Sequence, residues 1–416
     1  MEAALQIRGT DPSATDIGDI FWTDGRRRVE QFRIAAEMIV EPKAFDDFGR
    51  PADASSTFLR YQLEIGHEKP SYHGGLGRLV LLSEELRYIT EGDAPAHLLF
   101  PHRARSWRSS AVVNTRRTKS GYISTEKAAD GQTEILVHQE RSAGKPQRAP
   151  AATAPRTIVA TSNTSSTPTI LAARREMQSW RILSLEPTAM RGSDRFQDDS
   201  HVTANGAHLP ATLYRLAESA KADGDSTDSI YARIASRLSD LVPIIDVHVT
   251  RDDVRQLLTI EVEEKAGVTL PTRSLSDGTL RFLTLCILAE DPEAQGVICM
   301  EEPENGIHPA KLEAMINLLR DLVTNTEQQL SRDNPMRQVL IATHSPGMVQ
   351  LQNPEDVLFA SEVAVQGPWG EPARTLRCKP LTDTWRCIHA KPCIGLGTIL
   401  AYLTTPPGAQ ITLNDF

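Results

Sequence analysis

Two adjacent acids are the clearest chemical feature of this sequence. Glu301 and Glu302 directly follow the apolar run Val297–Met300, which is typical of a buried strand. In an open parallel sheet, ligands bind at the carboxyl ends of strands, and two consecutive side chains there point to opposite sides. One carboxylate can then hold Mg²⁺ while the other polarises an attacking water molecule. The alternative is a pair of solvated acids, which two adjacent acids alone would favour.

The residues after these acids favour the chemical interpretation. Pro303–Pro309 predicts a turn that leads into a helix, and Pro309 suits the first helical position. Apolar side chains then recur at helical spacing, which predicts a helix at Pro309–Val323 with one face on the core. They are Leu312, Met315, Ile316, Leu319, Leu322 and Val323.

His344 ends a second apolar run, Val339–Ala342, in the same way. A histidine at that end can donate to a γ-phosphate or hold a water molecule in place. The alternative is a ring satisfied by a neighbouring carbonyl, and for His344 alone the two interpretations are even. Because the double acid precedes it on the adjoining strand–helix unit, we favour a functional histidine.

A third stretch, Ser274–Thr279, opens a helix that is apolar nearly all round and is therefore expected to be buried. The N-terminus of this helix, with Ser276 and Gly278 beside unpaired backbone amides, suits an anion. The local sequence alone favours the alternative, which is an N-capped core helix.

Alternating helices and strands are expected to position these stretches, and such alternation implies a parallel sheet covered by helices. Strands are expected at Trp180–Leu185, Val247–Val249, Leu257–Val262, Val297–Met300 and Val339–Ala342, and helices at Leu209–Ala217, Ile230–Leu241, from Ser276 and at Pro309–Val323.

The first 140 residues indicate a different architecture. Thr57–Ile65 alternates apolar and polar residues, which predicts a half-buried strand of an antiparallel sheet. Further strands are expected at Phe32–Val40, Arg78–Tyr88 and Glu134–Gln139. Residues 142–170 are rich in Pro, Ala, Thr and Ser, which predicts a flexible connector with a short strand at Thr157–Ala160.

In this order the three stretches resemble the signature loop, the Walker B strand with its D-loop, and the H-loop of ABC-superfamily ATPases. Leu275–Thr279 and Glu301–Pro309 are similar to the RecF-like and OLD-like AAA ATPases of bacteria. The resemblance covers about residues 175–365 by motifs and residues 1–140 only in character. It implies an α/β fold of the ABC-ATPase type, with a parallel sheet core, helices on both faces and an N-terminal antiparallel β-rich lobe.

The resemblance divides the chain into four expected parts. Residues 1–141 form the β-rich lobe and residues 142–170 the flexible connector. Residues 171–265 form further strands and a helical lobe. Residues 266–416 form the ATPase core with the signature, Walker B, D-loop and H-loop, followed by C-terminal strands.

The resemblance also implies roles for single residues. Glu301 stands at the Mg²⁺-associated acid position, where many ABC proteins have Asp. Glu302 stands at the position of the catalytic glutamate, and His344 matches the switch histidine. ATP and Mg²⁺ are the implied cofactors.

The same resemblance implies a partner subunit. Ser276, Asp277 and Gly278 match the signature, which in this superfamily reaches the γ-phosphate on the opposite subunit. Asn305 and His308 lie in the D-loop, which helps the two halves communicate. Family members act as head-to-tail dimers, so we expect a homodimer or a pair with a related ATPase subunit.

One family feature is missing from the chain, which contains no G-x-x-x-x-G-K-[ST] string. The amides and lysine of that loop supply most of the grip on the phosphates and Mg²⁺. Three explanations stay open: an N-terminally truncated chain whose phosphate loop lies upstream of Met1, a degenerate subunit, or a decayed gene product. We favour truncation because Glu301, Glu302 and His344 are all retained, and we expect the chain alone to be inactive.

The charge and hydrophobicity of the chain limit which partners, nucleic acid or membrane, it is expected to bind. The net charge of −9 argues against a chain that coats nucleic acid by bulk charge. Arg26–Arg28 and Arg103–Arg108 leave DNA binding open, although charge runs are more often solvated faces. No apolar run is long enough for a membrane span, so we expect no membrane partner.

The five cysteines are few and odd in number, which fits reduced thiols in a cytoplasmic protein. A zinc site near the C-terminus is a remote alternative, because no C-x-x-C pair is present. Its ligands would be Cys378, Cys387, His389 and Cys393.

The first functional hypothesis is therefore an ATPase that acts in DNA transaction or anti-phage defence. The alternative is a non-hydrolysing interaction subunit that supplies its signature face to a complete ATPase partner. We expect no nuclease in the same chain, because the residues after His344 are few and lack the Asp-x-Asp of a Toprim metal site. Cleavage would need a separate nuclease or effector partner.

Overall fold

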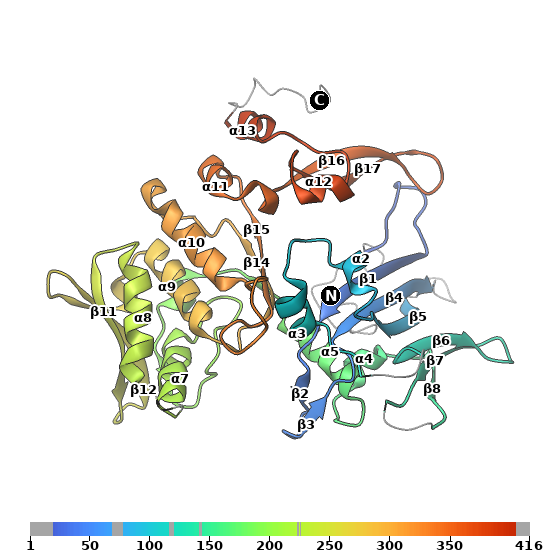
Figure 1. The fold of residues 1–416 in the computed structure, drawn as a ribbon, viewed down its shortest axis with the longest axis horizontal. Helices are drawn as coiled ribbons and strands as arrows, with labels where there is room; N and C mark the ends of the chain where they lie inside the picture. Colours follow the sequence, from blue (N-terminus) through green and yellow to red (C-terminus); the bar gives the residue numbers. More distant parts are fainter. Residues whose placement is uncertain are drawn as a thin grey trace. The chain divides into compact units, whose positions relative to one another are not determined.

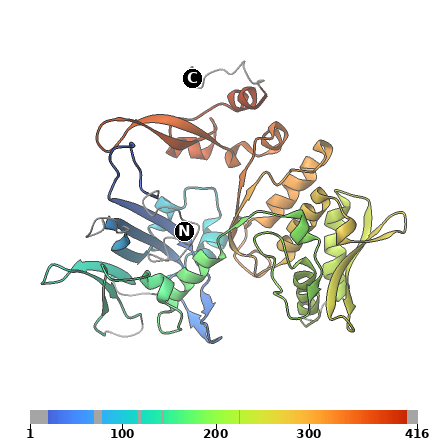
Figure 2. The same ribbon diagram turned by 180° about the vertical axis from the view of Figure 1, so that it is seen from behind.

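The chain forms two compact units, shown from opposite sides in Figures 1 and 2. The computed structural model describes residues 20–68, 78–115, 120–140, 144–222, 224 and 226–404. Each of the four parts predicted from the sequence, 1–141, 142–170, 171–265 and 266–416, includes some residues outside these ranges. Unit 1 takes its described residues from Met1–Gln178, Thr326–Leu330 and Glu362–Arg377. Unit 2 takes them from Ser179–Asn325, Ser331–Ser361 and Cys378–Phe416.

Unit 1 contains a six-stranded antiparallel sheet in the order β1-β4-β5-β6-β7-β8. Period-two alternation in the sequence becomes alternating burial in β4, where Leu59, Tyr61 and Leu63 are buried. The predicted antiparallel β-rich architecture is thus confirmed. The strands are β1 (Gln31–Ile39), β4 (Phe58–Glu68), β5 (Arg78–Tyr88), β6 (Ile123–Lys127), β7 (Thr133–Val137) and β8 (Gln147–Pro150).

Short elements complete unit 1. A hairpin pairs two short strands, and the segment before β6 is helical. These elements are β2 (Lys43–Phe45), β3 (Pro51–Asp53), α2 (Ala94–His97), the π-helix η2 (Ala104–Arg108) and α3 (Ser109–Ala111).

The segment predicted to be a flexible connector is ordered by polar contacts. The expected strand at Thr157–Ala160 is wrong, because Ile158–Thr161 forms the helical turn α4 and Pro168–Ser179 forms helix α5. The carboxylate of Glu84, buried in β5, accepts the backbone N–H of Ile158 at 2.7 Å and of Val159 at 3.0 Å. A buried carboxylate from a distant strand therefore anchors a segment that has few large apolar side chains.

Unit 2 is built on a parallel sheet of β9 (Arg181–Leu183), β14 (Gly296–Glu301) and β15 (Arg337–Ala342), with β14 in the centre. Helices α9 (Asp277–Glu290) and α10 (Leu312–Leu322) cover one face of this sheet and share its core with Ile298 and Met300 (Figure 1). The other face exposes Ile182 and Leu340. The predicted α/β class with a parallel sheet and a separate antiparallel sheet is confirmed.

A four-stranded antiparallel sheet and two helices extend the same core. The predicted pair of strands and both predicted helices are present. These elements are β10 (Asp194–Arg195), β11 (Ile244–Asp252), β12 (Leu257–Glu264), β13 (Thr269–Pro271), α7 (Leu209–Ala222) and α8 (Thr227–Ser239). Short helices stand at α6 (Pro187–Met190), η3 (Thr272–Ser274) and η4 (Pro309–Lys311).

The C-terminal region adds a small second core formed by Val349, Phe359, Leu381 and Ile399. Its elements are α11 (Pro346–Leu351), η5 (Pro354–Asp356), β16 (Leu358–Gln366), β17 (Pro372–Pro380), α12 (Trp385–His389) and α13 (Leu396–Thr404). Among the described residues, no helix has the length and apolarity that crossing a membrane requires.

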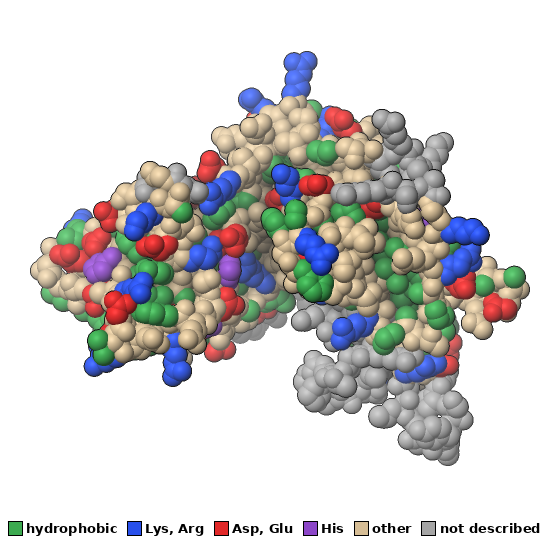
Figure 3. Space-filling model, turned by 90° about the horizontal axis from the view of Figure 1, so that it is seen from below, with side chains coloured by type: hydrophobic (Ala, Val, Ile, Leu, Met, Phe, Trp, Pro, Cys, Tyr) green, Lys and Arg blue, Asp and Glu red, His purple; other side chains and the backbone are tan. Residues whose placement is uncertain are grey.

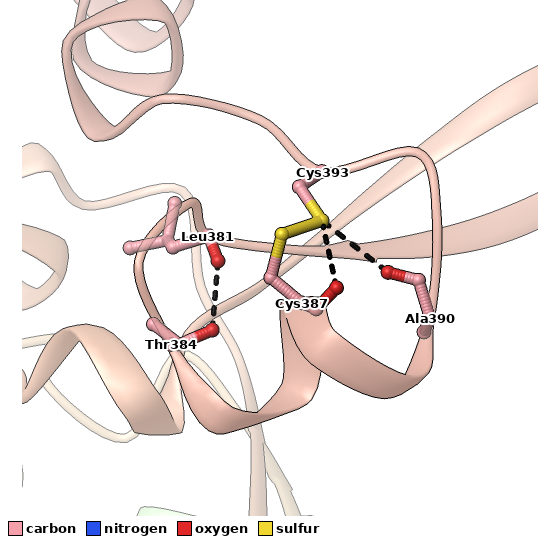
Figure 4. The surroundings of a disulfide bond; sticks show 5 residues. All are labelled: Leu381, Thr384, Cys387, Ala390 and Cys393. Atoms are coloured by element: carbon pink, nitrogen blue, oxygen red, sulfur yellow. Dashed lines mark hydrogen bonds between the residues drawn. A yellow bond between two sulfur atoms is a disulfide. The ribbon is translucent and has the colours of Figure 1, made fainter.

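A disulfide joins Cys387 in α12 to Cys393 (Figure 4), so the prediction that all five cysteines are reduced thiols is wrong for this pair. Cys387 stands on the last turn of a short helix and Cys393 on the return loop, which brings their Cα atoms to 5.8 Å. The bond also removes two thiolates from the remote zinc alternative, and Cys378 remains a free, exposed thiol.

Candidate functional site

The parallel pairing of β14 with β15 brings two of the predicted stretches to one edge of the sheet. Glu301 is the register partner of Ala342, and the N–H of Glu302 donates to the carbonyl of Ala342 at 2.8 Å. His344 follows Ala342 by two residues. The acids and the histidine therefore share the carboxyl ends of neighbouring strands, as the sequence predicts.

A cavity of about 500 Å³ opens at this edge. Its wall combines acids, an amide, an arginine and an imidazole from four segments of unit 2. The residues that carry these groups are Glu186, Arg281, Glu301, Glu302, Asn305 and His344. A cavity with a few convergent polar groups is the default candidate for a ligand site.

Glu302 is held in an unusual backbone conformation. Its φ is +43°, in the left-handed region that residues with a side chain rarely adopt. Its carboxylate is fixed by the side-chain amide of Asn305, whose Nδ2 donates to Oε2 at 2.7 Å. Strained backbone that the surroundings hold in place is concentrated at functional sites. The strain marks Glu302 as the acid with the more closely specified position.

Glu301 differs from Glu302 in its surroundings. It lies exposed at the end of β14, and its carboxylate forms no hydrogen bond with another described residue. Mg²⁺ prefers oxygen ligands, usually one or two carboxylates together with water and substrate phosphates. The exposed carboxylate of Glu301 and the neighbouring acid in the same cavity fit that donor set.

A second polar contact joins the two strand ends. The hydroxyl of Thr343 donates to Oε1 of Glu304, a carboxylate that is 8% exposed, and the N–H of Ser345 donates to the same hydroxyl at 2.9 Å. Glu304 lies two residues after Glu302, and Thr343 directly precedes His344. This contact therefore ties together the turns that carry the acid and the histidine.

The residues that resemble the signature lie at the N-terminus of α9 and do not line the cavity. Ser276 is the N-cap, and its side chain accepts the N–H of Thr279 at 3.2 Å. Asp277 accepts a hydrogen bond from Arg191 at 2.6 Å. Gly278 packs against the backbone of Gly306 in the turn after Glu302.

His308 also lies outside the cavity lining. It is exposed, and its Nδ1 accepts the N–H of Ala310 at 3.2 Å, which caps η4. Of the predicted site residues, the structure thus brings Glu301, Glu302, Asn305 and His344 together. It places Ser276, Asp277, Gly278 and His308 next to that group but outside the cavity.

Arg281 and Glu186 also line the cavity, although neither was predicted as a site residue. Arg281 stands inside α9 between Leu280 and Phe282, which are 0% and 1% exposed. A charged residue in the middle of a helix that is apolar nearly all round is a signal that could have identified it. Glu186 follows β9 and carried no comparable signal.

A second group of acids stands at the start of α7. Asp194, Asp198 and His208 place three potential ligand atoms within 4.8 Å of one another. The Asp194 carboxylate is already satisfied, because it lies 3.0 Å from Nδ1 of His208 and accepts the N–H of Ala211 at 2.9 Å. Burial raises the pKa of Asp194. These contacts explain the group as a cap for α7.

The basic runs considered for DNA are partly neutralised in unit 1. Arg27 lies 3.1 Å from Asp24 and 4.4 Å from the ring centre of Trp369. Arg103 pairs with Glu327 at 2.6 Å. On the face in Figure 3, Lys and Arg side chains of the described residues are interspersed with Asp and Glu and form no continuous stripe.

A family model matches the central part of the chain. Residues 138–349, just over half of the chain, match a family model described as "AAA domain, putative AbiEii toxin, Type IV TA system". A search of curated proteins found no match.

Among solved structures, the chain is similar to heads of SMC ATPases. An Smc head bound to the C-winged helix domain of ScpA is 8% identical, with a TM-score of 0.34 over 80% of this chain and 78% of that chain. An Smc head with an extended coiled coil from Pyrococcus furiosus, bound to the C-terminal domain of ScpA, is 8% identical, with a TM-score of 0.27 over 80% of each chain. A structure titled for ATP-driven dimerization and DNA stimulated activation of SMC ATPases is 10% identical, with a TM-score of 0.24 over 36% of this chain and 84% of that chain.

Proposed function

Because the chain belongs to the AAA domain family described for the AbiEii toxin of type IV toxin–antitoxin systems, we propose that it binds and hydrolyses ATP with Mg²⁺. The cavity at the ends of β14 and β15 carries this proposal, since it joins Glu301, Glu302 and His344 in one site. An acid pair at a strand end and a histidine after the neighbouring strand can supply a metal ligand, a general base and a phosphate donor for phosphoryl transfer to water.

Each residue has a distinct role in the proposed reaction. Glu302 accepts a proton from the attacking water, in an orientation that Asn305 fixes through its hydrogen bond. His344 donates to the terminal phosphate. Glu301 would hold Mg²⁺, and the ion would supply neutralisation of charge on the phosphate oxygens. The contact between Glu304 and Thr343 keeps the base and the histidine at a fixed separation.

We further propose a head-to-tail dimer, formed with a second copy or with a related ATPase subunit. Ser276 and Asp277 are exposed at the N-terminus of α9, and Gly278 is buried beside them. All three lie outside the cavity lining, which supports a role on the partner's nucleotide. His308 in the D-loop is exposed beside them. For the biological role we propose anti-phage defence or a DNA transaction with a separate effector partner. The family description itself names a type IV toxin–antitoxin system.

The alternative function is a non-hydrolysing subunit that lends its signature to a complete partner ATPase. The absence of a G-x-x-x-x-G-K-[ST] string in the sequence favours this alternative, whereas the intact acid pair favours hydrolysis. Nucleotide binding without turnover would support the alternative. Turnover that depends on Glu302 would exclude it.

The test measures Mg·ATP binding and steady-state hydrolysis by the full chain and by the Glu302→Gln variant. The sequence predicts that the chain is inactive alone, so we expect any turnover that the full chain shows to fall by at least about 100-fold in the variant, with nucleotide binding retained. Glu313→Gln is the matched control, because Glu313 is exposed in the first turn of α10. Turnover that is unchanged in Glu302→Gln would disprove the assigned base.

A further inference from the structure

Arg281 lies at the wall of the cavity without a partner among the described residues. It is half-buried, its Nε is buried and unsatisfied, and it forms no hydrogen bond or ion pair with another described residue. A guanidinium stays charged and carries five N–H donors. Buried polar groups are nearly always paired, so an unpaired one in a cavity points to a group that the chain itself does not supply.

The helix determines where this side chain lies. Residues three and four apart share a helix face, so Arg281 lies on the same face of α9 as Asp277 and Gly278. Gly278 packs against Gly306, which follows Asn305 in the cavity wall. Arg281 is therefore one helical turn beyond the signature and faces the acids across the same cavity.

The charges in the cavity define the ligand. Glu186, Glu301 and Glu302 line the cavity together with Arg281. Carboxylates alone suit a cation, whereas an arginine among them adds a binding point for an anionic oxygen. A phosphate group that carries a divalent cation satisfies both requirements at once.

We propose that the guanidinium of Arg281 binds a phosphate oxygen of the Mg²⁺–nucleotide in this cavity. This inference rests on the proposed function, which places the nucleotide there. The planar fork of arginine matches two phosphate oxygens, and a lysine would offer only a point charge. Arg281 is thus a binding residue that the signature helix contributes to the nucleotide of its own chain.

The experiment measures binding by isothermal titration calorimetry with the full chain and three probes: Mg·ATP, inorganic triphosphate with Mg²⁺, and adenosine. Arg281→Met keeps the apolar stem and removes the charge. We expect this variant to bind both phosphate probes about 10-fold to 100-fold more weakly, with unchanged adenosine binding. The affinity of Arg281→Lys for the two phosphate probes should lie between those of Arg281→Met and the wild type.

Arg233→Ala is the matched control. It removes an exposed arginine of α8 that pairs with Glu290, which lies at the C-terminal end of α9, away from the cavity. Its affinities should equal those of the wild type. Equal affinity of Arg281→Met and wild type for Mg·ATP would overturn the inference, and so would a wild-type chain that binds neither phosphate probe. Binding that depends on Arg281 without hydrolysis would leave the inference standing and count against the proposed turnover alone.

Discussion

Gly278 lies directly against the backbone carbonyl of Gly306. A Cβ atom built on Gly278 would stand 2.2 Å from that oxygen, and Gly306 itself has a φ of +85°. Contacts as short as this do not occur between real atoms, so a side chain at position 278 would force the two backbones apart. The N-terminus of α9 and the turn that carries Asn305 are thus joined through two glycines.

The change Gly278→Ala is expected to lower the free energy of unfolding by about 1–3 kcal/mol, as overpacking does in a close-packed site. It should also lower ATP turnover, because the displaced turn carries the amide that fixes Glu302. Urea unfolding and steady-state turnover measure the two effects.

Gly397→Ala is the control for this change. Gly397 lies in α13, and a Cβ atom there meets nothing within 4 Å. Alanine in a helix is more favourable than glycine, so this variant should be as stable as the wild type or slightly more stable. A Gly278→Ala chain with wild-type stability and turnover would show that the two segments can separate without cost.

The site residues that could be predicted from the sequence are those marked by the residues next to them in the chain. Glu301, Glu302 and His344 each end an apolar run, and parallel pairing then brings strand ends together whatever the details of packing. Arg281 was not predicted, because its meaning depends on which face of α9 borders the cavity. That face is set by packing between distant segments, which spacing along the chain does not reveal.

The same distinction explains the fold. β4 was predicted because its own residues alternate between apolar and polar, which matches the alternating burial of the strand. Within the predicted connector at 142–170, the strand expected at Thr157–Ala160 is wrong: Val159 is buried in the helical turn α4, and the N–H groups of Ile158 and Val159 reach the carboxylate of Glu84. That anchor lies more than seventy residues away along the chain. The composition of a segment shows how many apolar side chains it can bury. It does not show that a carboxylate elsewhere in the chain will bind its backbone.

The contact between Thr343 and Glu304 gives a second test. Oε2 of Glu304 is buried without a partner in the described residues, so the hydroxyl of Thr343 provides the side-chain hydrogen bond that this carboxylate has. Thr343→Val should cost about 1–3 kcal/mol of unfolding free energy, because a buried acceptor loses its donor. Thr343→Ser keeps the hydroxyl and should retain most of the stability. Equal losses in both variants would assign the effect to packing.

Glu84 gives stability in unit 1 a pH dependence. Burial raises the pKa of Glu84 from 4.5 to about 7, so the folded chain binds a proton more tightly than the unfolded chain. The contribution of Glu84 to stability is therefore fully present below about pH 4.5 and is lost as pH rises through about 7, by about 3 kcal/mol in total. Urea unfolding across this range measures the slope.

The variant Glu84→Gln should remove that slope, although it lowers absolute stability because an amide cannot accept from both Ile158 and Val159. Glu85→Gln is the control, since neighbouring residues of a strand point to opposite faces and Glu85 pairs instead with Arg87. It should keep the wild-type slope. A Glu84→Gln chain with that slope intact would place the titrating group elsewhere.

Asp194 gives the last test, because it caps helix α7 from the preceding strand β10. Its carboxylate accepts the N–H of Ala211 in the first turn of α7 and contacts His208, whose φ of +67° is unusual for a residue with a side chain. Asp194→Ala should cost about 0.5–2 kcal/mol, the range for a lost N-terminal cap. Asp198→Ala, which removes an exposed acid from the same group, should change stability by about 0.5 kcal/mol or less. If the two substitutions cost the same in urea unfolding, the capping role assigned to Asp194 is wrong.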